Sequence, residues 1–145
     1  MKAPHRYSSS SISQCCRETG QPFPRDIGAF VRCIFESLSL KYRFVFDRLQ
    51  HLMKKKLDTI HIVGGGSQNE MLNQFTANAT GAVVLAGPVE ATALGNVIVQ
   101  AVAKGILGSI EEGRELIYRS YPVSRYEPQD QEAWNEAFER HKDHF

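Results

Sequence analysis

The chain has 145 residues and a formal net charge of +1, with 17 basic and 16 acidic side chains, so its length fits one domain with a sizeable core. This balance gives no long-range field to attract nucleic acid or an anionic membrane, and no apolar run approaches the roughly 20 residues that cross a bilayer. Because the first residues also lack the apolar core of a secretion signal, we expect a soluble, cytoplasmic protein that binds neither nucleic acid nor membrane.

The first 24 residues are polar and rich in chain-breaking residues. They contain a run of serines at 8–11, followed by Gly20, Pro22 and Pro24. Such a composition lacks the apolar density that offsets the entropy of ordering. We expect residues 1–24 to form an irregular or partly disordered lead-in, and residues 25–145 to form the folded lobe.

One long amphipathic helix is expected next. Asp26 is a favourable N-cap residue, and apolar side chains then recur at i, i+3 and i+4 from Ile27 to Leu52. The basic run at 54–56 suits the end of this helix, because cations complement the negative end of the helix dipole.

The segment after this helix has the pattern of a strand, a glycine turn and a second helix. Residues 59–63 have the β-branched character of a buried strand, and they stop at three glycines, 64–66. Asn69 lies near the start of a helix expected over about 68–80, which ends at Gly81. A strand, a glycine turn and a helix N-terminus form a concave wall of backbone N–H groups, which an anion or a flat base can approach.

A second strand-to-helix unit follows. Residues 83–86 form a short apolar strand that ends at 87–88, a Gly-Pro pair, and a helix is expected over 90–104. Parallel pairing of the two strands with a right-handed crossover gives an α/β arrangement. It also places both turns at the same rim of the sheet, where they outline a crevice.

The remaining pattern is helical, with expected helices over 110–119 and 130–142 and an irregular piece containing Pro122 and Pro128 between them. Only two strands are therefore predicted. A two-stranded unit is marginal by itself, and an unpaired strand edge invites association. The pattern indicates a piece of a larger domain, or a chain that completes its sheet with a partner.

Several residues allow both a structural and a functional interpretation. The glycine turn is not a dinucleotide fingerprint, because Asn69 replaces the third glycine, and it is not a Walker A loop, because the chain has no Gly-Lys pair. Glu90 is interpreted as a first-turn acid rather than a catalytic base, since no second carboxylate or histidine has a sequence relation to it. Gly95, inside a good helix pattern, indicates close helix packing or access for a ligand.

The cysteines are odd in number and form no Cys-x-x-Cys pair: Cys15, Cys16 and Cys33. No histidine accompanies them at ligand spacing. We expect reduced thiols with no assigned role, and we predict no metal site.

Three segments carry a resemblance to a known family: 60–69 (IHIVGGGSQN), 72–74 (LNQ) and 86–96 (AGPVEATALGN). They closely resemble the C-terminal part of the rhamnulokinases, a group within the FGGY carbohydrate kinases. Segments 16–22, 36–43 and 126–128 are similar as well, so the resemblance runs from about residue 16 to residue 140. Asn78 departs from the aspartate expected in its helix, at a position to which the family assigns no chemistry.

The resemblance implies an actin/hexokinase-like (ribonuclease H-like) fold, whose C-terminal lobe binds ATP with the adenosine against the glycine turn. By position, Gly65 contacts the nucleotide, with Gly64, Gly66 and Asn69 beside it. The rhamnulokinases transfer the γ-phosphoryl group of ATP to the 1-hydroxyl of L-rhamnulose, using Mg²⁺ and an aspartate as general base. Such a transfer relies on positioning and charge neutralisation, so metal, phosphate loops and base must all be present.

The resemblance also implies an incomplete enzyme. No residue here matches the family's phosphate-binding hairpin, sugar-binding lobe or catalytic aspartate, so no catalytic residue is predicted. We expect an inactive C-terminal fragment, with the missing strands upstream of Met1. The alternative is a non-enzymatic remnant or assembly piece, which forms a homodimer through an exposed sheet edge or helices or complements an N-terminal half.

Overall fold

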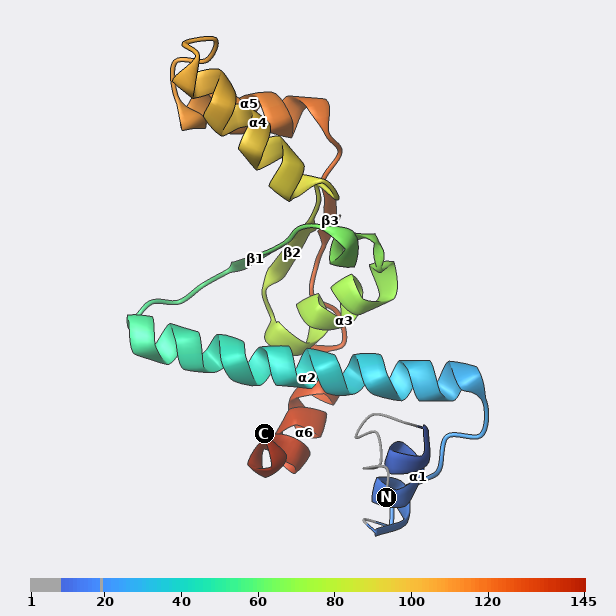
Figure 1. Ribbon diagram of the computed structural model, residues 1–145. Helices are drawn as coiled ribbons and strands as arrows, with labels where there is room; N and C mark the ends of the chain where they lie inside the picture. Colours follow the sequence, from blue (N-terminus) through green and yellow to red (C-terminus); the bar gives the residue numbers. More distant parts are fainter. Residues whose placement is uncertain (1–8, 19) are drawn as a thin grey trace, which may run out of the picture. The chain divides into compact units, whose positions relative to one another are not determined.

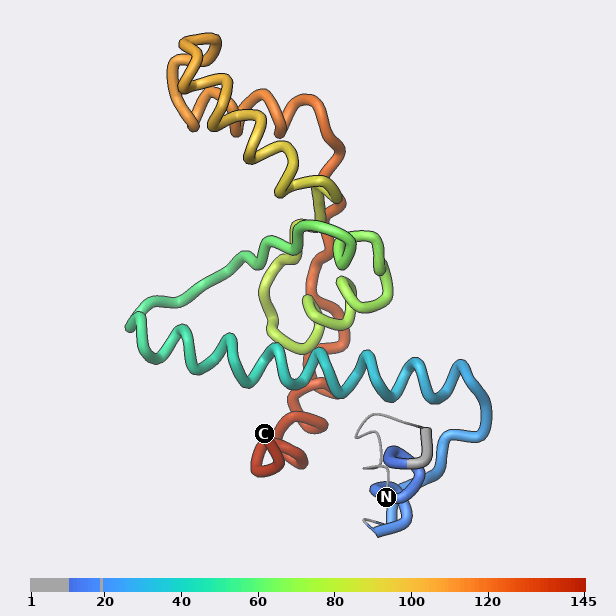
Figure 2. Tube along the Cα trace, viewed as in Figure 1, coloured from blue at the N-terminus to red at the C-terminus, as the bar shows by residue number. Residues whose placement is uncertain are grey.

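The computed structural model describes residues 9–18 and 20–145 (Figures 1 and 2). The chain divides into two compact units between Leu38 and Ser39, inside helix α2 (Ile27–Met53). The predicted long helix is confirmed, and Asp26 caps it, because the Asp26 Oδ1 atom accepts a hydrogen bond of 2.8 Å from the N–H of Ala29. The helix ends at Met53, and the next residue, Lys54, has a φ of 49°, in the left-handed region.

The first unit contains a helix where the sequence predicted an irregular lead-in. Helix α1 spans Ser9–Glu18, while residues 1–8 and 19 lie outside the described residues. Ser13 and Cys16 are three positions apart on one face and both are buried. The Gln14 side chain also donates a hydrogen bond of 2.8 Å to Glu18 one turn later. The sequence did not predict helix α1, because the serine run at its start has no apolar periodicity.

No disulfide is formed by Cys15, Cys16 or Cys33. Cys15 is exposed, Cys16 is buried and Cys33 is half-buried. Burial raises the pKa of the Cys33 thiol, with a smaller contribution from the nearby Cys16. The neutral thiol is therefore the favoured form at this position.

A three-stranded mixed sheet organises the second unit, in the order β1 (Thr59–Ile62), β2 (Val83–Ala86) and β3 (Ser124–Tyr126). β1 and β2 are parallel, as predicted, whereas β2 and β3 are antiparallel. β3 corrects the prediction of an irregular piece at this place. It has only three residues and no apolar alternation, so its pairing with β2 is the only evidence for a strand.

Helix α3 (Glu70–Thr80) packs on β2 and on helix α6 (Gln131–His141), which continues into the short helix η2 (Lys142–His144). The predicted helices at these places are confirmed. Gly81 ends α3 in the left-handed conformation, also as predicted. The most deeply buried apolar side chains of the core are small or branched and include Ala77, Ala79 and Val84. Phe46 and Phe138 are also buried, and the Phe75 and Trp134 rings lie 5.3 Å apart.

The side chain of Asn78 on α3 ties this helix to the segment before α6. Its Oδ1 atom accepts hydrogen bonds from the Gln129 N–H, at 3.0 Å, and from the Gln74 side chain, at 2.8 Å. The backbone carbonyl of Asn78 accepts a third, from the side chain of Gln131. Because Oδ1 acts only as an acceptor here, a neutral amide meets the same need as the aspartate expected at this position.

Helices α4 (Ala91–Ala103) and α5 (Ile110–Ser120) pack on each other. Their close contact is at Gly113, where an added Cβ atom would come within 2.5 Å of the Ile98 side chain. Gly95, the glycine singled out in the sequence, is exposed, and an added Cβ atom there would have nothing within 4 Å. The interpretation of Gly95 as a close packing residue is therefore wrong.

Within the described ranges, 9–18 and 20–145, no helix is long and apolar enough to cross a membrane.

Candidate functional site

The two strand-to-helix turns lie side by side, because the parallel strands β1 and β2 end next to each other (Figure 1). We call residues 64–69 the glycine turn and residues 87–90 the proline turn. The Gly64 N–H donates a hydrogen bond of 3.1 Å to the Pro88 carbonyl, and the Gly87 N–H donates one of 2.8 Å to the Ile62 carbonyl. The predicted placement of both turns at one rim of the sheet is confirmed.

The glycine turn begins with a backbone conformation that requires glycine. Gly64 has φ 78° and ψ −163°, a combination that a side chain makes unfavourable. A single 3-10 turn, η1 (Gly65–Gln68), follows, and the N–H and hydroxyl of Ser67 both donate to the Gly64 carbonyl, at 3.0 and 2.7 Å. The first N–H groups of such a turn, those of Gly65 and Gly66, have no acceptor within the turn itself.

Gly65 occupies the open side of this turn. It is exposed, and an added Cβ atom would have nothing within 4 Å, whereas one on Gly66 would touch the Ile62 side chain at 3.8 Å. The φ of Gly65 also lies outside the left-handed region. Neither packing nor backbone strain therefore requires a glycine at position 65.

Asn69 starts helix α3. The helix was predicted from about residue 68 and begins at Glu70, because η1 comes first and Asn69 takes the N-cap position. Its Oδ1 atom accepts a hydrogen bond of 3.0 Å from the Leu72 N–H. The Nδ2 group is then the end of this half-buried side chain that can donate to a ligand.

Sequence reasoning missed Asn73, which supports the glycine turn from below. This residue is wholly buried, and its Nδ2 group donates a hydrogen bond of 2.9 Å to the Ser67 carbonyl. The available signal was a polar side chain on the buried face of α3, one turn after the capping Asn69.

The proline turn is shaped by its backbone surroundings. Gly87 has φ 127°, the Gly87–Pro88 peptide is cis, and an added Cβ atom on Gly87 would lie 3.0 Å from the Pro122 carbonyl oxygen. Glu90 occupies the N-cap position of α4 but makes no cap hydrogen bond with its side chain, which is exposed. The turn therefore has little room for side chains on its inner side.

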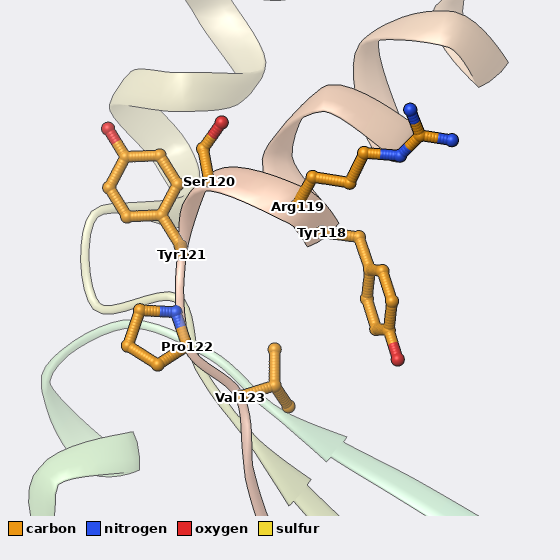
Figure 3. Close-up of a pocket in the computed structure, with 6 residues that line it drawn as sticks. All are labelled: Tyr118, Arg119, Ser120, Tyr121, Pro122 and Val123. Carbon is orange, nitrogen blue, oxygen red and sulfur yellow. The ribbon is translucent and has the colours of Figure 1, made fainter.

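Two hollows in the second unit lie away from the glycine turn. One, of about 440 Å³, is formed by the single connector 118–123, and its two tyrosine side chains, Tyr118 and Tyr121, point to opposite sides (Figure 3). The other, of about 720 Å³, lies between α2 and the C-terminal helices, and its apolar walls include Phe44 and Phe138. Neither of these two hollows is lined by a residue of the glycine turn.

No part of the described chain brings together three or more histidine, cysteine, aspartate or glutamate side chains that could hold a metal ion. The polar groups of the glycine turn are backbone N–H groups, the Ser67 hydroxyl and amide side chains, and the proline turn adds the single carboxylate of Glu90. Such groups suit a neutral or anionic organic ligand better than a bare cation.

An α/β unit with two glycine-containing turns at one rim of its sheet fits the family that a comparison with known proteins finds. Residues 4–104 match the C-terminal domain of the FGGY family of carbohydrate kinases. The chain therefore belongs to this family, and its fold is consistent with the predicted actin/hexokinase-like architecture, with a sheet that is mixed rather than purely parallel.

Among its relatives, the chain is similar to rhamnulokinases. That of Bacteroides thetaiotaomicron is 52% identical over 128 residues, which cover 88% of this chain and 26% of the relative. Those of Halalkalibacterium halodurans and Bacillus subtilis are 42% and 38% identical, over 83% and 82% of this chain and 26% and 24% of the relatives. The chain thus spans about a quarter of the length of these relatives. The resemblance stated from the sequence is confirmed, while the assigned nucleotide contacts stay predictions.

Proposed function

We propose that this chain is the adenosine-binding part of a kinase that transfers the γ-phosphoryl group of ATP to L-rhamnulose, giving L-rhamnulose 1-phosphate in rhamnose catabolism. Membership of a carbohydrate kinase family and similarity to rhamnulokinases support this reaction. The sugar site and the general base then belong to residues outside these 145, so the chain by itself binds ATP or ADP but phosphorylates no sugar. A cytoplasmic location follows from the same substrates.

Gly65 carries the proposal for the nucleotide site. Packing and backbone conformation leave room for a side chain at this position, so the space above its backbone is available to a flat ligand. A base or ribose lying there would approach the first N–H groups of η1 more closely than it could if residue 65 carried a Cβ atom.

The other predicted contacts have distinct roles around that surface. Gly64 sets the backbone direction, Gly66 lies over the Ile62 side chain, and Asn69 presents its Nδ2 group beside the turn. The phosphates would extend from this surface toward the rest of the kinase. Mg²⁺ neutralises phosphate charge in phosphoryl transfer, and the described residues offer no carboxylate cluster of their own to hold it.

The test is a titration of the purified chain with ATP and ADP, followed by calorimetry and by a thermal shift. Ligand at a hundredfold excess over its Kd stabilises a folded protein by about 2.7 kcal/mol. We expect Gly65→Ala to leave the unfolding midpoint without ligand almost unchanged and to weaken nucleotide binding at least tenfold, because the methyl group fills the proposed contact surface.

Gly95→Ala is the companion variant, since it also adds a methyl group at an exposed glycine with nothing within 4 Å, and it tests the ligand access that the sequence allowed at this glycine. It should stabilise α4 by about 0.5–1 kcal/mol. Unchanged nucleotide affinity in Gly95→Ala would show that the ligand lies on the glycine turn and not on α4. Equal nucleotide affinity in the Gly65→Ala variant and the wild type would overturn the assignment of this site.

A second candidate, an assembly piece, is favoured by two exposed features of the second unit. β1 is at the edge of the described sheet, and apolar side chains on the later turns of α2 remain exposed, among them Tyr42, Val45 and Leu49. Both are surfaces that another polypeptide can cover. Sedimentation of the chain alone distinguishes the candidates: a dimer that binds no nucleotide supports the assembly piece, and a monomer that binds ATP contradicts it.

A further inference from the structure

We infer that Asn73 is a positioning residue for the nucleotide site: it holds the glycine turn in the orientation in which the N–H groups of the turn contact the ligand. This inference rests on the proposed function. It concerns a side chain that lies one layer below the turn and that none of the predicted contacts includes.

A continuous series of hydrogen bonds runs from Asn73 to the proline turn. The Asn73 Nδ2 group donates to the Ser67 carbonyl at 2.9 Å. The Ser67 hydroxyl and N–H donate to the Gly64 carbonyl at 2.7 and 3.0 Å, and the Gly64 N–H donates to the Pro88 carbonyl at 3.1 Å. Each member fixes the orientation of the next peptide group, so the amide of Asn73 influences both turns.

Burial makes this arrangement rigid. Asn73 has no exposed surface, and Ser67 is 8% exposed, so water competes little for these hydrogen bonds. Both residues follow Gly65 in the chain and hydrogen-bond to the backbone of the turn that contains it, so a change in peptide orientation there would turn the first N–H groups of η1 away from a ligand.

The other end of the Asn73 side chain argues for positioning rather than stability. Its Oδ1 atom is buried and has no hydrogen-bond partner among the described protein groups. An apolar side chain of similar size would avoid the cost of burying that oxygen. An apolar side chain could not donate a hydrogen bond to the Ser67 carbonyl. The Nδ2 group is therefore the part of Asn73 that matters for the glycine turn.

Asn73→Asp is the sharpest variant, because it keeps the shape of the side chain and replaces the donating Nδ2 group with an acceptor. Ser67→Ala is a second variant, which removes only the hydroxyl in the middle of the series. Asn78→Ala is the matched control: it removes a buried asparagine of the same helix, whose hydrogen bonds lead away from the glycine turn to Gln74 and Gln129.

Two measurements are made on the whole chain at a temperature where every variant is folded. The first is the Kd for ADP by calorimetry, and the second is amide hydrogen exchange by NMR at the N–H groups of Gly64 and Gly87. We expect Asn73→Asp to weaken ADP binding at least tenfold and to speed exchange at Gly64 at least tenfold. Ser67→Ala should have the same effects to a smaller degree, and Asn78→Ala should change both by less than twofold.

Unchanged ADP affinity and unchanged Gly64 exchange in Asn73→Asp would overturn the inference, as would equal losses in Asn78→Ala. Should Asn73→Asp fail to fold, Ser67→Ala decides by the same two measurements. A wild-type chain that binds neither ADP nor ATP overturns the proposed function instead. In that case Gly64 exchange alone decides whether Asn73 holds the turn.

Discussion

Both turns at the rim of the sheet connect a strand to the helix that follows it, but their shapes are stabilised in different ways. In the glycine turn, side chains define the shape: Ser67 and Asn73 hydrogen-bond to its backbone, and Asn69 caps the helix that follows it. In the proline turn, the N-cap residue Glu90 makes no side-chain cap bond, and the backbone is confined by its neighbours at Gly87. The comparison teaches that the first turn is sensitive to lost polar groups, whereas the second is sensitive to added bulk.

The largest effect is expected from bulk in the proline turn. Gly87→Ala adds a methyl group where φ is 127° and where a backbone oxygen, that of Pro122, lies 3.0 Å away. Backbone strain and overlap together should lower the free energy of unfolding by about 3 kcal/mol. Urea unfolding followed by the fluorescence of Trp134, the single tryptophan, measures this loss. A loss below about 1 kcal/mol would show that the segment before β3 moves to make room for the methyl group, and it would contradict the view that the proline turn is confined.

The same substitution in the glycine turn should cost less. Gly64→Ala meets backbone strain at φ 78°, but the nearest atom to the added methyl group, the Val89 carbonyl oxygen, is 3.9 Å away. We expect a loss of about 1–2 kcal/mol from strain alone. The urea midpoints of the two alanine variants give the order directly, and a Gly64→Ala variant less stable than Gly87→Ala would reverse the comparison.

Loss of a polar group is the complementary test. Asn69→Ala removes the cap on the Leu72 N–H and should lower the free energy of unfolding by about 1 kcal/mol. Asn69→Asp keeps the accepting oxygen and the cap, so its stability should match that of the wild type. Asp lacks the Nδ2 donor and adds a negative charge, so ATP binding should weaken in this variant as well. Tight ATP binding by Asn69→Asp would remove Asn69 from the proposed contacts.

These differences also explain what the sequence could predict. Asp26 and Gly81 act on backbone groups within three or four residues of themselves, so their roles as helix caps follow from local pattern. The parallel pairing of β1 and β2 follows from chain order, because a helix connects two buried strands. With the pairing, the sequence predicted that both turns lie at one rim.

The parts that the sequence missed depend on contacts between distant residues. β3 is defined by its pairing with β2, and Asn73 has a role only because η1 folds back over it. Gly95 and Gly113 are both glycines within helices, yet only Gly113 lies where a neighbouring helix excludes a side chain. Sequence periodicity predicts the apolar face of a helix and does not show where that face meets another element: in α2, Tyr42, Val45 and Leu49 lie on the predicted apolar face and are exposed.

The smallest effect is expected at the cap of the proline turn. Glu90→Ala removes an exposed side chain that makes no cap hydrogen bond, so only its favourable charge at the start of α4 is lost. That interaction is about 0.3–1 kcal/mol at low ionic strength and is screened by salt, so the urea midpoint should move little and less still at 0.5 M NaCl. Glu90→Gln separates the charge from the shape of the side chain and should behave as Glu90→Ala does. A salt-independent loss as large as that of Asn69→Ala would mean that Glu90 supports its turn as Asn69 does. The two turns would then share one mechanism of stabilisation.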